Sequence, residues 1–190
     1  MLLCFAVLVL MVIWVVWSNT ALVATHIEVC SNRLSAEFSG FRIAHVSDLH
    51  NAELGENNED LLKMISEANP DIIAVTGDLI DSNHTDVDIA LRFMEDAVQI
   101  APVYYVPGNH EARIQEYEVF RDQLESIGAI VLEDRAVPIE REGAAINLIG
   151  LSDPAFEHVR GEETHAMVRA KLNILTDTEN MFAILLSHRP

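Results

Sequence analysis

The fold is indicated most clearly by residues 71–78, which read Asp-Ile-Ile-Ala-Val-Thr-Gly-Asp. The run 72–76 is almost wholly apolar, which is typical of a strand buried on both faces, as parallel strands are. Gly77-Asp78 follows this run directly. The stretch therefore predicts a central strand with a carboxylate at its carboxyl end, where open α/β sheets place their active sites.

Three other apolar runs are also followed by polar residues. The run 41–47 precedes Asp48-Leu49-His50, the run 103–106 precedes Gly108-Asn109-His110-Glu111, and the run 182–186 precedes Ser187-His188. Each run predicts a strand, so all these side chains are expected at one edge of a sheet. Carboxylate, amide and imidazole groups gathered there would suit a hard or borderline divalent metal.

Helical periodicity separates the predicted strands. Apolar spacing predicts helices beginning at about Asn57, between Asp86 and Val98, and over 113–126, which gives parallel strands with right-handed crossovers. The segments 129–132, 136–140 and 145–150 predict short strands of an antiparallel or mixed section, and 162–175 predicts a last helix. The alternating segment His26–Ser31 predicts one further strand. The fold class is α/β with a mixed sheet.

Charge narrows the function. The chain has 30 acidic and 12 basic residues, a formal net charge of −18, and no basic run. Binding to nucleic acid or to an anionic membrane through a general basic surface is therefore not expected. A small phosphorylated substrate remains compatible, because bound metal ions reverse the local charge.

The first 24 residues differ from the rest in composition. Leu2–Trp17 is uninterrupted apolar sequence, somewhat short of the roughly 20 residues that span a bilayer, and Ser18–Ala24 could extend it. We expect a single-pass membrane anchor over 1–24 and a folded domain over 25–190. A cleaved signal peptide and a buried core helix are the alternatives. Because Lys and Arg are nearly absent here, the side of the membrane is left open.

Several of these residues also have ordinary explanations when each is taken alone. Asp78 could cap a helix, His188 could be structural, and the two residues flanking the motifs, Arg113 and Arg189, could be surface arginines or phosphate contacts. Asp153 is a further loop carboxylate that could act as a ligand. Taken together, the polar residues that follow four predicted strands favour a shared site.

The four motifs together resemble the calcineurin-like metallophosphoesterase superfamily, in particular its bacterial membrane-associated branch, over residues 41–190. The resemblance implies an α/β/β/α sandwich and two divalent metal ions, with Mn, Fe and Zn as the candidates. Asp48 and His50 would bind the first metal, Asp78 would bridge both, and Asn109 and His188 would bind the second. His110 would not bind metal; as the catalytic residue it would protonate the leaving oxygen or stabilise the charged transition state.

The family pattern closes with a Gly-His-x-His element, which does not occur in residues 1–190. The resemblance therefore implies a partial domain, incomplete at its C-terminus, whose 190 residues would be inactive for lack of ligands. The expected function is hydrolysis of a small phosphomonoester or phosphodiester, including lipid-linked ones, near a membrane. A pseudoenzyme that serves as a binding surface is the alternative, and a nuclease is a weaker one. The oligomeric state is left open.

Overall fold

The computed structural model describes residues 5, 7–12, 14–15, 21–157, 159, 161–176 and 181–189. Much of the predicted anchor, including residues 1–4 and 16–20, lies outside this range. Within the described part of the chain, no helix has both the length and the apolar character needed to cross a membrane.

The first sheet consists of four parallel strands in the order β1-β2-β3-β4. Their bounds are β1 Ile43–Val46, β2 Ile72–Thr76, β3 Val103–Val106 and β4 Ile130–Val131. Three helices connect them in sequence: α2 Glu59–Ala68, α3 Val87–Ile100 and α4 Tyr117–Ile127. This strand–helix alternation confirms the parallel arrangement predicted from the sequence.

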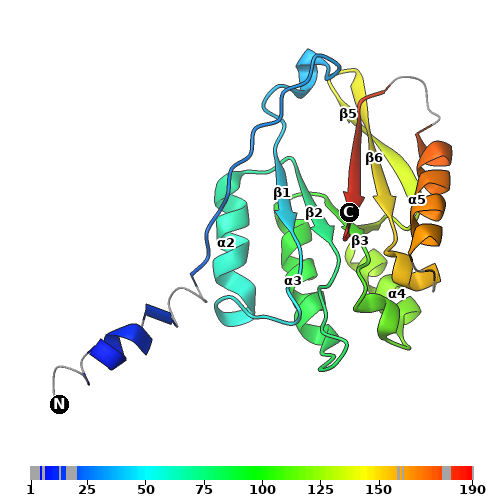
Figure 1. The fold of residues 1–190 in the computed structure, drawn as a ribbon. Helices are drawn as coiled ribbons and strands as arrows, with labels where there is room; N and C mark the ends of the chain where they lie inside the picture. The colour runs from blue at the N-terminus through cyan, green and yellow to red at the C-terminus, as the bar shows by residue number, and fades with distance from the viewer. Residues whose placement is uncertain are drawn as a thin grey trace.

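The second sheet has the order β5-β6-β7, with β5 Arg135–Arg141, β6 Ala144–Leu151 and β7 Ala183–Ser187. β5 and β6 form an antiparallel hairpin, whereas β7 pairs parallel to β6. Helix α5, Glu162–Leu175, lies on the outer side of this sheet (Figure 1). The remaining elements are short 3-10 turns at Ala36–Phe38, Glu56–Asn58, Glu111–Arg113 and Pro154–Glu157.

Two hydrophobic clusters show how the layers stack. Alternate residues of β2 and β3, such as Ile73 and Tyr105, pack with apolar residues of α2, α3 and α4. The intervening residues, such as Ala74 and Val106, pack with Leu148 and other residues of the second sheet. The order of layers is therefore helices, parallel sheet, mixed sheet and α5, because side chains alternate between the two faces of each strand.

Local sequence explains most helix ends. The Asp86 side chain accepts a hydrogen bond from the Asp88 backbone N–H, which caps α3. Asn69, just before Pro70, takes a left-handed conformation and ends α2. Helix α2 begins at Glu59, two residues after the predicted start at Asn57, because both Asn57 and Asn58 have positive φ.

Three sequence predictions were wrong in detail. The segment 129–132 was expected in the antiparallel or mixed section, but its strand β4 pairs parallel to β3 in the first sheet. No strand forms over His26–Ser31: the described backbone there has no regular structure, and the Ile27 side chain is 82% exposed. Alternating side chains do not make a strand without a neighbouring strand to pair with. The helix predicted over 113–126 is instead a 3-10 turn, Glu111–Arg113, followed by α4 from Tyr117.

Candidate metal centre

The candidate site lies where β1, β2, β3 and β7 end. Asp48 and Asp78 each come two residues after the last residue of their strands, and His188 follows β7 directly. His50 and His110 lie in the loops after β1 and β3. The structure thus brings five of the six predicted site residues together at one edge.

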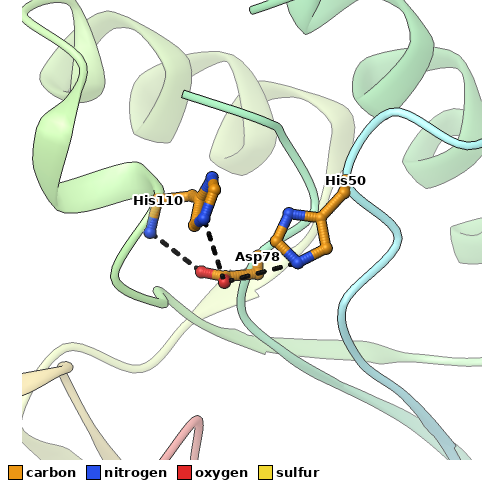
Figure 2. Close-up of side chains that lie close together, drawn as sticks. All are labelled: His50, Asp78 and His110. Carbon is orange, nitrogen blue, oxygen red and sulfur yellow. Dashed lines mark hydrogen bonds and ion pairs between the residues drawn. The ribbon is translucent and has the colours of Figure 1, made fainter. Parts of the chain in front are cut away.

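Figure 2 shows His50 and His110 on either side of Asp78. The Nε2 atoms of His50, His110 and His188 lie 3.6, 3.9 and 3.3 Å from the Oδ2 atom of Asp78. Two atoms that bind one metal with bonds of about 2.1 Å are themselves roughly 3.0–3.5 Å apart. The spacing around Asp78 is therefore close to that of ligands sharing an ion.

Two groups of side chains could each hold a metal ion. One consists of His50, Asp78 and His110, and the other of Asp48, Asp78 and His188, with the ligand atoms of each group within 4.8 Å of one another. Asp78 belongs to both groups, and only 3% of its surface is exposed to solvent. A carboxylate with two oxygens at such a position could bridge two ions.

The backbone of this site is unusual. Asp48, His50 and Asp78 have φ values of 58°, 47° and 52°, in the left-handed region that most residues avoid. Each such residue costs on the order of 1 kcal/mol and persists only where its surroundings hold it. Such strain at three neighbouring site residues supports a functional role for this edge of the sheet.

Hydrogen bonds define the tautomer of His188. Its Nδ1 lies 2.9 Å from the Thr76 carbonyl oxygen, which can only accept. Nδ1 therefore carries the proton, and Nε2 presents a lone pair toward Asp78. A backbone carbonyl bound to the far nitrogen is the usual support of a metal-binding histidine.

His110 has the opposite arrangement. Its Nδ1 accepts a hydrogen bond from the Ser82 backbone N–H at 3.0 Å, and the Asp81 carboxylate lies 3.4 Å away. In the neutral ring the proton then lies on Nε2, the atom nearest Asp78. His110 is thus oriented as a hydrogen-bond donor, and it would have to lose this proton to bind a metal.

Asn109 is the sixth predicted residue. It lines a cavity beside the cluster, and within the described part of the chain its side-chain amide has no hydrogen-bond partner. A free amide oxygen there is available to an ion.

Glu111 was quoted in the sequence motif, but we assigned it no role. It is completely buried, and each of its carboxylate oxygens accepts two hydrogen bonds. Oε2 accepts from the backbone N–H groups of Asp78 and Gly108, and Oε1 accepts from those of Leu79 and Ile80. Burial raises the pKa of Glu111, against the lowering effect of these hydrogen bonds. Glu111 therefore joins the loops after β2 and β3.

The same two loops pass very close to each other at Gly77 and Gly108. A Cβ atom at Gly108 would lie 2.6 Å from the Asp78 backbone nitrogen, and a Cβ atom at Gly77 would lie 2.6 Å from Gly108. Only glycine fits such an approach. The glycines thus allow Asp78 and His110 to come together.

Asp153 and Arg189 form a pair at the edge of the site. Asp153 is completely buried, and its Oδ2 accepts a hydrogen bond from the Arg189 Nε at 2.6 Å. This bond raises the pKa of the Arg189 guanidinium. Asp153 is thus occupied by an ion pair, and Arg189 is anchored one residue after His188.

A cluster of Asp and His at the carboxyl edge of a sheet could hold metal ions, and comparison with known families identifies the class of protein to which such a site belongs. Residues 41–190 match the calcineurin-like phosphoesterase family, and the chain belongs to this family. Metal-dependent hydrolysis of phosphate esters is the activity that the family suggests.

Relatives include the uncharacterized metallophosphoesterase YkoQ of Bacillus subtilis, which is 31% identical over 58% of this chain and 43% of its own length. A transmembrane protein with a metallophosphoesterase domain from Danio rerio is 27% identical over 86% of this chain and 38% of its own length. The chain therefore spans about two fifths of the length of these curated relatives.

Solved structures share the fold. The phosphopantetheinyl hydrolase PptH of Mycobacterium tuberculosis superposes with a TM-score of 0.56 at 18% identity, covering 78% of this chain and 68% of that one. TT1561 of Thermus thermophilus superposes with a TM-score of 0.59 at 18% identity, covering 78% of this chain and 72% of that one. At such low sequence identities, the similarity supports only the α/β fold, with one parallel and one mixed sheet.

Proposed function

We propose that this protein hydrolyses phosphate esters with two divalent metal ions held around Asp78. The proposal rests on the observation that Asp78 belongs to both groups of potential metal ligands. Asp48 and His50, whose Oδ1 and Nε2 atoms lie 3.6 Å apart, would complete the first site, and Asn109 and His188 the second. This assignment divides the ligands differently from the two groups found in the structure, which pair His50 with His110 and Asp48 with His188, and it leaves His110 to act on the substrate. When bound, the two cations would supply the positive charge that activates water and stabilises the phosphoryl oxygens.

His110 has the geometry of a proton donor in this reaction. The Ser82 backbone N–H occupies its Nδ1, so a proton on Nε2 is directed into the site. As the ester bond breaks, the leaving oxygen gains negative charge, and a positioned acid can protonate it. The same imidazole N–H could also stabilise charge on a phosphoryl oxygen.

The donor set fits hard or borderline ions. Carboxylates, an amide and imidazoles suit Mn²⁺, Fe²⁺ and Zn²⁺. Cys30, the cysteine that the structure describes, is exposed and belongs to neither group of potential metal ligands. The described residues give each proposed ion three protein ligands when Asp78 is counted twice. The remaining coordination positions would be open to water and to substrate oxygens.

We further propose that the protein acts at a membrane on a small phosphate ester, lipid-linked ones included, rather than on nucleic acid. The apolar run Leu2–Trp17 supports this, as do relatives in Danio rerio and Bos taurus that are named transmembrane proteins. The net charge of −18 disfavours a polyanionic partner. Cell fractionation before and after deletion of 1–24 tests the membrane attachment.

The activity test uses purified protein with Mn²⁺ and p-nitrophenyl phosphate or its bis ester. The resemblance implies that residues 1–190 alone would be inactive; we propose instead that three protein ligands for each ion are sufficient. We expect metal-dependent hydrolysis that Asp78→Asn abolishes and Asp96→Asn, an exposed position on α3, does not. Metal binding without hydrolysis of either ester would contradict the proposal and favour a non-catalytic binding role.

A further inference from the structure

A cavity of about 1040 Å³ opens beside the metal centre. Asn109 and Ser187, the sequence neighbours of the site residues His110 and His188, are among the residues that line it. Its volume reaches the upper end of the roughly 300–1,000 Å³ found for small-molecule sites. The space is far larger than a single phosphate group needs, so it can take a substantial part of a substrate.

One wall of the cavity is apolar. Helix α5 provides Val168 and Leu172, and β7 provides Leu185 from the face opposite to the buried Leu186. The structure describes every residue of α5, and none of them is buried. No residue of the helix is thus fully buried in a core, and Val168 and Leu172 line the cavity together with the polar α5 residues Thr164, His165, Arg169 and Asn173.

The charge of the cavity is opposite to that of the chain. Acidic residues outnumber basic ones by 30 to 12 overall, yet none of the described lining residues is Asp or Glu. The lining includes Arg113, Arg169 and Arg189. Arg189 is neutralised by Asp153. The guanidinium groups of Arg113 and Arg169 pair with no residue in the described part of the chain.

We propose that this cavity binds the leaving-group part of the substrate, and that this part carries a second anionic group on an apolar moiety. Arg113 and Arg169 would bind the anion, because unpaired guanidinium groups match phosphate or carboxylate oxygens. Val168, Leu172 and Leu185 would contact the apolar moiety. This inference rests on the proposed phosphoesterase function, since it assigns the second half of the same substrate.

A prenyl diphosphate has the required chemistry and serves as a probe. One water is consumed: the bond between the terminal phosphorus and the bridging oxygen breaks, and phosphorus gains the oxygen of water as inorganic phosphate. The bridging oxygen leaves with the electron pair of the broken bond and takes a proton, which His110 would provide. The leaving group is then a prenyl monophosphate, which is both anionic and apolar.

Binding is tested first, independently of turnover. Anilinonaphthalenesulfonate is an apolar anion that fluoresces on binding, and phenylnaphthylamine is the same molecule without the sulfonate. In the full chain, Arg169→Gln should reduce the preference for the anionic probe by about 3-fold, the effect of losing one charge contact of an exposed arginine. The matched control is Arg92→Gln, at an exposed arginine on α3 that forms no ion pair with any residue the structure describes, and this variant should leave the preference unchanged.

Leu172→Ala should weaken binding of both probes, about 3- to 10-fold each, because it removes part of the apolar wall. If neither Arg169→Gln nor Leu172→Ala changes the binding of the two probes, the cavity assignment is refuted, whether or not the protein hydrolyses p-nitrophenyl phosphate.

Rates of hydrolysis then distinguish a substrate with an apolar anionic leaving group from one with a polar anionic leaving group. We compare kcat/KM of the manganese-loaded protein for geranyl diphosphate and for ADP, whose leaving group is anionic but polar. We expect geranyl diphosphate to be preferred, and Leu172→Ala to reduce that preference. Equal or better turnover of ADP would overturn the apolar assignment, whereas failure to hydrolyse any ester, p-nitrophenyl phosphate included, would refute the proposed function itself.

Discussion

Glu111 accepts a hydrogen bond from the backbone N–H of Asp78 at 2.9 Å, although the two residues are 33 positions apart. The same carboxylate holds Gly108 at 2.7 Å, so one buried side chain sets the spacing between the loops after β2 and β3. The position of Asp78 therefore depends on a residue that does not face the metal centre.

Glu111→Gln should destabilise the fold by about 2–4 kcal/mol. A carboxamide has one oxygen, so its NH₂ group would face two of the four backbone donors and leave them without acceptors. Urea denaturation of the variant measures the loss. Glu125→Gln, an exposed position on α4, is the control, and a similar loss for both variants would contradict this role of Glu111.

Asp78→Asn should abolish binding of both metal ions, because it removes the charge that the two ligand groups share. Asparagine tolerates the left-handed conformation of this residue, so the backbone should be retained. Calorimetric titration with Mn²⁺ gives the stoichiometry. Asp48→Asn removes a ligand of one group alone and should leave one ion bound; two ions bound to Asp78→Asn would show that Asp78 is not a bridging ligand.

His110→Ala should preserve metal binding and slow hydrolysis of an alkyl phosphate by about 10²–10⁴-fold, the usual contribution of general acid catalysis. An aryl phosphate should be affected less, because its leaving oxygen needs no proton. The ratio of kcat values for the two esters is the measurement. Equal losses on both esters, or loss of bound Mn²⁺, would assign His110 to the metal instead.

Gly108→Ala should destabilise the protein and reduce its affinity for metal, because the added methyl group collides with Asp78. We expect a loss of about 2–4 kcal/mol, in the range of severe steric substitutions. Gly143→Ala is the control: its φ is 87°, but an added Cβ meets no atom within 4 Å, so backbone strain of about 1 kcal/mol is the whole cost. Comparable melting temperatures for the two variants would contradict this account.

Local patterns were sufficient to predict the parallel sheet and the positions of Asp48, Asp78 and His188. Asp78 follows an apolar run that forms the fully buried β2, whereas β1 and β7, which precede Asp48 and His188, are only partly buried. In all three cases the hydrophobic run was sufficient to locate the strand and its end. The segment His26–Ser31 shows where this reasoning fails, because alternation of side chains does not reveal whether a partner strand exists.

Roles that depend on contacts distant in the sequence could not be predicted. The hydrogen bonds of Glu111 to the loop after β2, and the pairing of Asp153 with Arg189, join residues more than 30 positions apart. The tautomers of His110 and His188 are likewise set by backbone groups of other loops. Sequence reasoning identified these residues as polar groups near the site, but not what each of them contacts.

The hydrogen bond from His188 to the Thr76 carbonyl spans 112 residues of the chain. Contacts of such long range form late, because closing a long loop costs entropy before the contact repays it. The metal centre therefore cannot assemble until β7 has docked against the parallel sheet. Binding of metal ions would then occur only after the chain has finished folding. During synthesis, the residues around Asp78 would leave the ribosome long before His188, so the nascent chain would bind metal only weakly.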